Sequence, residues 1–261
     1  MKRTFFFAAV FSLAAAFASA QFEGIATFKM TMGSGPDLRA QGDGRIFLSS
    51  AGYRVEWTMD LSSMRKDHEK AVAAPTMAMT MLARKADPGK VYMLNDEKKT
   101  YSVVDPGQAD NRGMPKDTFT VKKLGTAKVA GVSCQNALLT SSKNIEIEVC
   151  VAKELTASTD WLASLNRRSP EGTSWLAALK EQGIEGFPVR WVIRKTGSPQ
   201  PLTTLEMTRL EKKPLAASLF EVPAGYTETK ASMRGLTPEQ EKALSKMRGN
   251  RSAQPTPTPR P

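Results

Sequence analysis

The clearest pattern in this chain is Arg54-Val55-Glu56-Trp57-Thr58-Met59-Asp60-Leu61, in which polar and apolar residues alternate without a break. A period of two is typical of a β-strand that buries one face, because successive side chains point to opposite sides of a sheet. Val55, Trp57, Met59 and Leu61 would then share the buried face. Such a strand fits a curved antiparallel sheet whose outer face is polar.

Shorter segments of the same character lie on both sides of this one. They are separated by turns rich in glycine, proline and serine, such as residues 33–36 and 50–52. We expect strands at residues 26–32, 45–48, 77–81, 91–94, 100–104, 119–123, 128–134, 132–140, 144–151, 189–194 and 202–210.

Between residues 153 and 183 the apolar spacing changes to that of short amphipathic helices. The first is expected to begin at Thr159 and Asp160, and the second to begin at residues 169–171 and to end at Gly183. We therefore predict a mainly β fold: a curved, half-open antiparallel sheet, or incomplete barrel, with short helices covering its concave face.

The two ends of the chain differ in composition from this domain. Residues 1–20 combine Lys2 and Arg3, an apolar run and Ala18-Ser19-Ala20, which together predict a cleaved signal peptide. Because no cysteine follows the cleavage point, we expect a soluble periplasmic or secreted protein without a lipid anchor. The predicted domain covers residues 21–230, followed by a helix at 231–248 and a disordered proline-rich tail at 249–261.

The charge balance is basic. Removal of residues 1–20 would lower the formal net charge from +11 to +9, with 35 basic and 26 acidic residues remaining. This excess favours anionic envelope polymers or a membrane surface as partners, although a basic surface that only maintains solubility explains it equally simply. Nucleic acid is not expected outside the cytoplasm, and we expect a monomer.

Cys134 and Cys150 are the only cysteines, and they fall in two predicted strands joined by Ser141-Ser142-Lys143. If that turn is centred on Ser142, the two cysteines stand opposite one another, within the range of a disulfide. A structural disulfide suits an oxidising compartment better than a catalytic pair, since no Cys-x-x-Cys motif is present.

Twelve of the 13 methionines lie after residue 20, and several are spaced as in strands. Three interpretations remain open. Methionine is a deformable core residue, its flexibility suits the wall of a cavity for acyl chains, and its thioether suits Cu(I).

Nothing in the sequence indicates catalysis or a resident cofactor. His68 is the single histidine and lies between Asp67 and Glu69, as a solvated side chain would. Glu146 and Glu148 share one face of a predicted strand, which is more typical of a solvated surface than of an acid–base pair. The nucleophile elbow, the zinc-protease motif and the glycine-rich phosphate loop are all missing from the sequence.

Several fragments in a fixed order resemble a known family. They are Phe22-Glu23-Gly24, Tyr53-Arg54-Val55-Glu56-Trp57, residues 94–101, Val129-Ala130-Gly131-Val132-Ser133-Cys134, Gly186-Phe187-Pro188-Val189 and Leu219-Phe220-Glu221-Val222-Pro223-Ala224-Gly225-Tyr226. Their order resembles an exported bacterial family, domain of unknown function 4412, and the wider LolA/LolB-like superfamily of periplasmic lipoprotein carriers. This resemblance implies a half-open sheet with helices on its concave side and an apolar cavity that holds acyl chains in the carriers.

Three functional hypotheses follow. The first is a non-catalytic exported protein that binds a hydrophobic or lipid-like ligand in an apolar cavity. The second is a structural or interaction protein of the cell envelope with a filled core, and the third is a methionine-based copper or oxidant-responsive protein. The residues expected to line the cavity are Phe28, Met30, Val55, Trp57, Met59, Met77, Met79, Met81 and Trp175.

Overall fold

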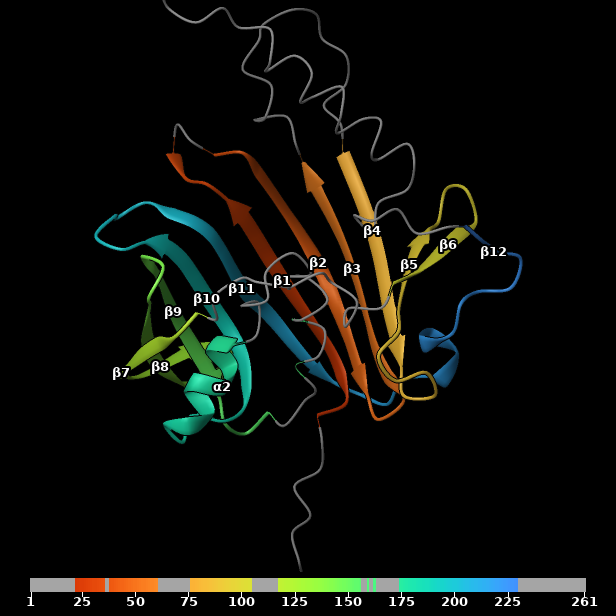
Figure 1. Cartoon of the computed structure of the whole chain (residues 1–261). Helices are drawn as coiled ribbons and strands as arrows, with labels where there is room; N and C mark the ends of the chain where they lie inside the picture. The colour runs from red at the N-terminus through yellow and green to blue at the C-terminus, as the bar shows by residue number, and fades with distance from the viewer. Residues whose placement is uncertain are drawn as a thin grey trace, which may run out of the picture.

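The computed structural model of the chain describes residues 22–35, 38–60, 76–104, 117–155, 159, 162 and 174–229. These form a 12-stranded sheet in the order β12-β6-β5-β4-β3-β2-β1-β11-β10-β9-β8-β7, with β12 and β7 at its two edges (Figure 1). Every neighbouring pair is antiparallel except β12 with β6. The strands are β1 (Gly24–Met32), β2 (Ala40–Ser49), β3 (Gly52–Asp60), β4 (Thr76–Arg84), β5 (Val91–Asn95), β6 (Thr100–Val104), β7 (Phe119–Val129), β8 (Val132–Ser141), β9 (Ile145–Ala152), β10 (Phe187–Lys195), β11 (Pro201–Lys212) and β12 (Thr227–Glu228).

The sheet curves around one apolar face, which we call the inner face. A single hydrophobic cluster contains Val55 of β3 and Met81 of β4 together with Leu139 of β8 and Trp191 of β10. Since these strands lie far apart in the strand order, the sheet must bend strongly for their side chains to belong to one core. The predicted curved, half-open antiparallel sheet is therefore confirmed, and Figure 1 shows that it does not close into a barrel.

Helix α2 (Ser174–Glu181) packs on the inner face near β9 and β10 (Figure 1). Trp175 and Leu179 are buried, and the Trp175 ring lies 6.5 Å from the ring of Trp191. The helix ends as predicted at Gly183, whose φ of 69° is the left-handed conformation that glycine adopts readily. The Ile184 N–H then donates to the Leu179 carbonyl at 3.0 Å, which satisfies the last turn.

Several predictions lie outside the described residues. These are the signal peptide at 1–20, His68, the start of the second helix at 169–171, the C-terminal helix at 231–248 and the tail at 249–261. Of the first predicted helix only Thr159 and Leu162 are described. Leu162 is helical and buried, and its N–H donates to the Thr159 carbonyl at 2.9 Å.

Strand β2 is longer than the predicted segment 45–48, because it spans Ala40–Ser49 and pairs with both β1 and β3 along that length. A Cβ atom on Gly44 would lie 2.5 Å from Cζ of Phe28 and 2.5 Å from the carbonyl oxygen of Glu56. Only glycine permits so close an approach between neighbouring strands. The missing side chains at Gly42 and Gly44 also explain why the alternating pattern did not reveal the first half of β2.

The predicted strand at 128–134 is wrong, because the chain reverses direction within it. Strand β7 runs to Val129, with a bulge before Gly125, and β8 begins at Val132. Between them Ala130 and Gly131 have φ values of 48° and 85°. Positive φ at both central residues is the geometry of a tight two-residue hairpin.

Cys134 and Cys150 form the predicted disulfide, with their Cα atoms 5.4 Å apart. The predicted pairing of the strands is wrong by two residues, since Cys150 faces Asn136 and the cysteines are diagonal neighbours. The turn consists of residues 142–144 rather than 141–143, and Asn144 has a φ of 60°. A shift of two residues keeps each side chain on its face of the sheet, so the disulfide still forms.

The chain after β11 crosses to the opposite edge of the sheet, and we call residues 213–229 the C-terminal strap. It contains the 3₁₀-helix η4 (Ala217–Phe220), whose Phe220 is buried, and ends with β12 beside β6. Val222 and Tyr226 of the strap pack against a cluster that includes Leu82 of β4 and Tyr92 of β5. Because Leu82 alternates with the inner-face residue Met81, the strap covers the outer face of the sheet there.

Candidate functional site

The inner face of β1–β4 consists of side-chain rows that run across the strands. The register gives the rows Met30–Gly42–Met59–Met77, Phe28–Gly44–Trp57–Met79 and Ala26–Ile46–Val55–Met81. Directly opposite residues in antiparallel strands have Cβ atoms about 4.5–5.5 Å apart, so side chains within a row touch. Among the described residues of these four strands, the inner face carries no charged side chain.

Eight of the nine predicted cavity residues are brought together by these rows. Trp175 is separate, because it lies on α2 against Trp191. Five of the nine are buried in hydrophobic clusters, namely Phe28, Val55, Met59, Met81 and Trp175. The other four are half-buried, namely Met30, Trp57, Met77 and Met79. Their contact with a ligand stays a prediction.

Burial decreases along the inner face from the third row to the first. Val55 is 0% exposed and Met81 is 1% exposed, whereas Met30 and Met77 of the first row keep part of their surface in contact with solvent. A separate small cluster forms at this end of the sheet. We call it the methionine patch, and it consists of Met30, Met32, Met59 and Met77 with Trp57 and Ala40.

Sequence reasoning did not include Met32, Ala40 or Gly42 in the site. Met32 follows Met30 on the same face of β1 and stands opposite Ala40 of β2. The signal for Met32 was present, since it continues the alternation of β1 by one step. The contribution of Ala40 and Gly42 is the absence of bulk, which a search for large apolar residues does not detect.

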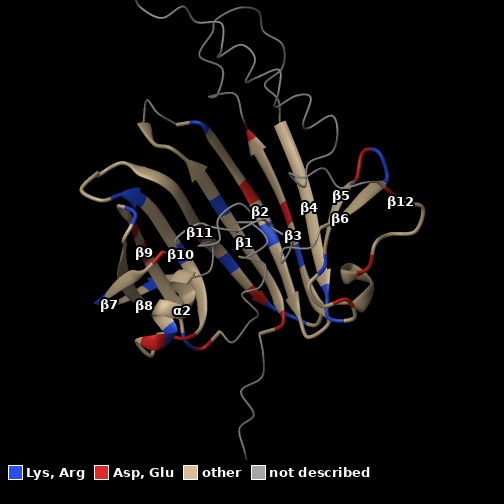
Figure 2. Ribbon diagram, viewed as in Figure 1, with Lys and Arg blue, Asp and Glu red and all other residues tan. Residues whose placement is uncertain are grey.

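The outer face of the same strands is polar. Figure 2 shows acidic and basic residues close together on β1, β2 and β3. Glu56 accepts hydrogen bonds from Arg45 of β2 and from Arg54 of its own strand, each at 2.7 Å. The predicted outward orientation of the polar residues of β3 is thus visible in their ion pairs.

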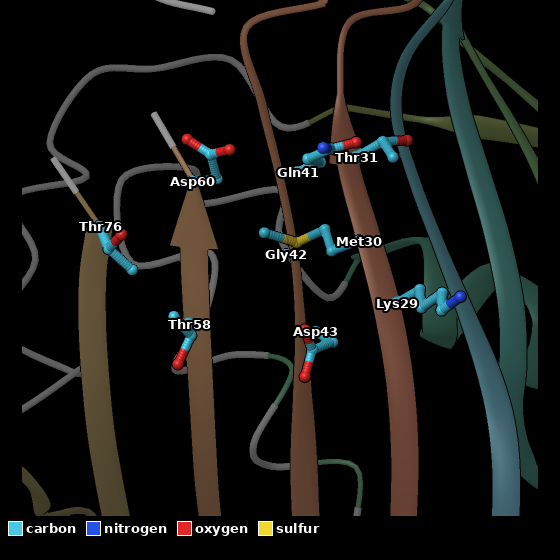
Figure 3. A pocket seen from close by; sticks show the side chains of 9 residues that line it. All are labelled: Lys29, Met30, Thr31, Gln41, Gly42, Asp43, Thr58, Asp60 and Thr76. Carbon is cyan, nitrogen blue, oxygen red and sulfur yellow. The ribbon is translucent and has the colours of Figure 1, made fainter. Parts of the chain in front are cut away.

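Two open hollows lie on this outer face. The first has a volume of about 360 Å³ and is bordered by Lys29, Met30, Thr31, Gln41, Gly42, Asp43, Thr58, Asp60 and Thr76 (Figure 3). The second, of about 410 Å³, is bordered by Thr27, Asp43, Gly44, Arg45, Glu56, Trp57, Thr58, Ala78, Met79, Thr80 and Asp96. Phe28, Val55, Met59, Met77, Met81 and Trp175 border neither hollow.

Hydrogen bonds hold the C-terminal strap at the edge of the outer face. The Tyr226 hydroxyl donates to Asp96 at 2.6 Å, and burial together with this hydrogen bond raises the pKa of Tyr226 to about 12. On β4, Arg84 pairs with Glu221 of the strap, and it also donates to Tyr92 at 3.1 Å. These contacts fasten the strap and leave the inner face untouched.

Two further searches of the described ranges bear on the kind of site. No helix there has the length and apolarity needed to cross a bilayer. In the same ranges, no group of three or more His, Cys, Asp or Glu side chains is arranged to hold a metal ion.

Residues 22–226 match the family described as Domain of unknown function (DUF4412). The chain belongs to this family. The match spans the whole described sheet almost to its last strand, and it agrees with the family resemblance seen in the sequence fragments. No curated protein sequence matches this DUF4412 protein significantly.

Solved structures resemble the DUF4412 protein only distantly. An uncharacterized conserved protein from Thermus thermophilus aligns with 78% of this chain and 90% of its own, at 9% identity and a TM-score of 0.41. A chain of the Pseudomonas aeruginosa MucA/MucB complex aligns with 80% of this chain and 57% of its own, at 13% identity and a TM-score of 0.40. The DUF4412 protein thus spans less than two thirds of that chain. Similarity at this level carries no functional information.

Proposed function

We propose that this protein is an exported, non-catalytic binding protein that takes a hydrophobic or lipid-like ligand on the inner face of its sheet. The main support is the partial exposure of Met30, Trp57, Met77 and Met79 on a curved surface without charged side chains among the described residues of β1–β4. Large apolar side chains left accessible in a concave surface are typical of ligand sites.

The choice of residues fits a flexible ligand. Methionine has three rotatable side-chain bonds and a polarisable sulfur, so a surface built from it adjusts to chains of different shape. The buried third row, with Ile46 and Val55, uses stiff β-branched residues instead. Rigid packing below and adjustable side chains above is the arrangement that acyl-chain binding requires.

The cellular location supports the same class of ligand. The pattern of residues 1–20 and the disulfide between Cys134 and Cys150 both indicate export to an oxidising compartment. The resemblance to LolA/LolB-like carriers implies acyl chains as ligands. The basic net charge would add attraction to anionic membrane surfaces or envelope polymers.

Native mass spectrometry of the exported protein, purified without detergent, tests this proposal. We expect a population whose mass exceeds that of the polypeptide by one lipid, and uptake of a fluorescent fatty acid by the delipidated protein. Met79→Glu should abolish both signals, because it places a charge among the inner-face side chains. Ala78→Glu, one residue away on the outer face of β4, is the matched control and should leave both unchanged.

A polypeptide mass alone, together with no uptake of the fluorescent fatty acid, would overturn the proposal. The inner face would then be an ordinary filled core, and the protein would act through its outer surface as a structural or interaction protein of the envelope. Equal effects of Met79→Glu and Ala78→Glu on uptake would also contradict the inner face as the site.

A further inference from the structure

We propose that the methionine patch binds one Cu(I) ion through the thioether sulfurs of Met30, Met32, Met59 and Met77. Thioethers are soft ligands that select Cu(I) over the harder divalent cations. The inference is independent of a lipid-like ligand, because it depends on the sulfur atoms and not on the apolar surface of the side chains.

The structure selects a set of methionines that sequence spacing alone does not. Met77, Met79 and Met81 follow one another on β4, but Met81 is 1% exposed in the main core and Met79 is not a member of the patch. The patch instead combines Met30 and Met32 of β1, Met59 of β3 and Met77 of β4. Four thioethers from three strands therefore meet in one cluster.

Gly42 makes this meeting possible. It occupies the row position on β2 between Met30 of β1 and Met59 of β3, and it offers no side chain to separate them. Figure 3 shows the Met30 side chain extending from β1 toward Gly42. On the far side, Met59 and Met77 stand directly opposite each other in the β3–β4 pair. Long, flexible methionine side chains bridge the remaining width.

The surroundings suit a monovalent soft cation. The inner face of β1–β4 has no lysine or arginine among its described residues, so no positive charge on it repels the ion. Met30, Met32 and Met77 are half-buried, which leaves a route from solvent to the sulfurs. Neutral ligands in a partly wetted site avoid the large cost of burying several charges together.

Competition with the colorimetric chelator bicinchoninate, under anaerobic reducing conditions, measures Cu(I) binding by the purified exported chain. We expect one Cu(I) per chain. The Met30→Leu/Met77→Leu variant should weaken binding by about tenfold or more, the effect of about 1.4 kcal/mol of lost coordination. Met81→Leu, two residues beyond Met79 on the same face of β4, is the matched control and should bind as the wild type does.

Leucine preserves apolar volume while removing sulfur, so these variants separate the two proposals. They should keep fatty-acid uptake and a normal circular dichroism spectrum while losing Cu(I). If the wild-type protein takes up no Cu(I), or if the double variant with an unchanged spectrum binds Cu(I) as tightly as Met81→Leu, the copper site is refuted. Neither result affects the proposal of a lipid-like ligand.

Discussion

At the scale of single residues, Gly44 controls how closely β1, β2 and β3 approach. We expect Gly44→Ala to lower the free energy of unfolding by about 1–3 kcal/mol, the usual cost of inserting a methyl group into a packed site. The added Cβ would lie 2.5 Å from the Phe28 ring and 2.5 Å from the carbonyl oxygen of Glu56. Urea unfolding monitored by circular dichroism measures the change.

A double-mutant cycle identifies the cause of that destabilisation. Phe28→Leu removes the ring atom nearest the new methyl group, so the two substitutions together should cost less than the sum of their separate effects. Strict additivity would show that the Phe28 ring is not what excludes a side chain at position 44.

Tyr226 gives the fold a dependence on alkaline pH. Its pKa is raised from an ordinary value near 10 to about 12 by burial and by its hydrogen bond to Asp96. A group whose pKa is raised in the folded state stabilises the fold below its unfolded pKa and loses that contribution as pH rises through the folded pKa. We therefore expect the unfolding free energy to fall between about pH 10 and pH 12.

Tyr226→Phe isolates this contribution from the lysines that titrate in the same range. The variant should be less stable than the wild type at pH 8, and the difference between the two proteins should shrink toward pH 12. Chemical unfolding at a series of pH values measures it. A difference that stays constant up to pH 12 would contradict a role for this hydroxyl.

At the scale of elements, the β8–β9 hairpin is fixed by its disulfide. Replacing Cys134 and Cys150 together by alanine should lower the unfolding free energy by about 3 kcal/mol, the loop-entropy value for a closed loop of about 15 residues. The two cysteines are separated by 16 positions in the sequence. A reducing agent should destabilise the wild type by a similar amount and leave the double-alanine variant unchanged.

The alternating pattern predicted the strands that have a side chain at every inner position, such as β3 and β4. It failed where glycine interrupts the pattern, as at Gly42 and Gly44 of β2, and where a turn of equal composition could be placed in two ways. Residues 141–144 are Ser-Ser-Lys-Asn, and only the left-handed φ of Asn144 decides that the turn begins at Ser142. Local composition does not encode that choice.

At the scale of the whole molecule, the sequence predicted a half-open curved sheet but not its closure on the outer side. The C-terminal strap could not be foreseen, because β12 has only two residues and owes its place to distant contacts such as Tyr226 with Asp96. The candidate site shows the same limit. Its large side chains were predicted from alternation, whereas the grouping of Met32 and Met77 depends on the register of four strands.

The open edge formed by β7 leads to a last prediction. An unpaired edge strand can pair with a second molecule, and lysine side chains discourage such pairing. Strand β7 is a sheet edge, and Lys122, Lys123 and Lys128 on it are exposed. We expect a monomer for the wild type, and concentration-dependent association when these three lysines are replaced by threonine, measured by sedimentation velocity.

The control removes the same charge from strands that already have two neighbours. Lys29→Thr, Lys195→Thr and Lys212→Thr act on β1, β10 and β11, which are interior strands of the sheet, and all three lysines are exposed. This triple variant should remain monomeric, because its lost charges guard no open edge. Equal association of the two triple variants would mean that net charge, rather than the lysines along β7, keeps the molecules apart.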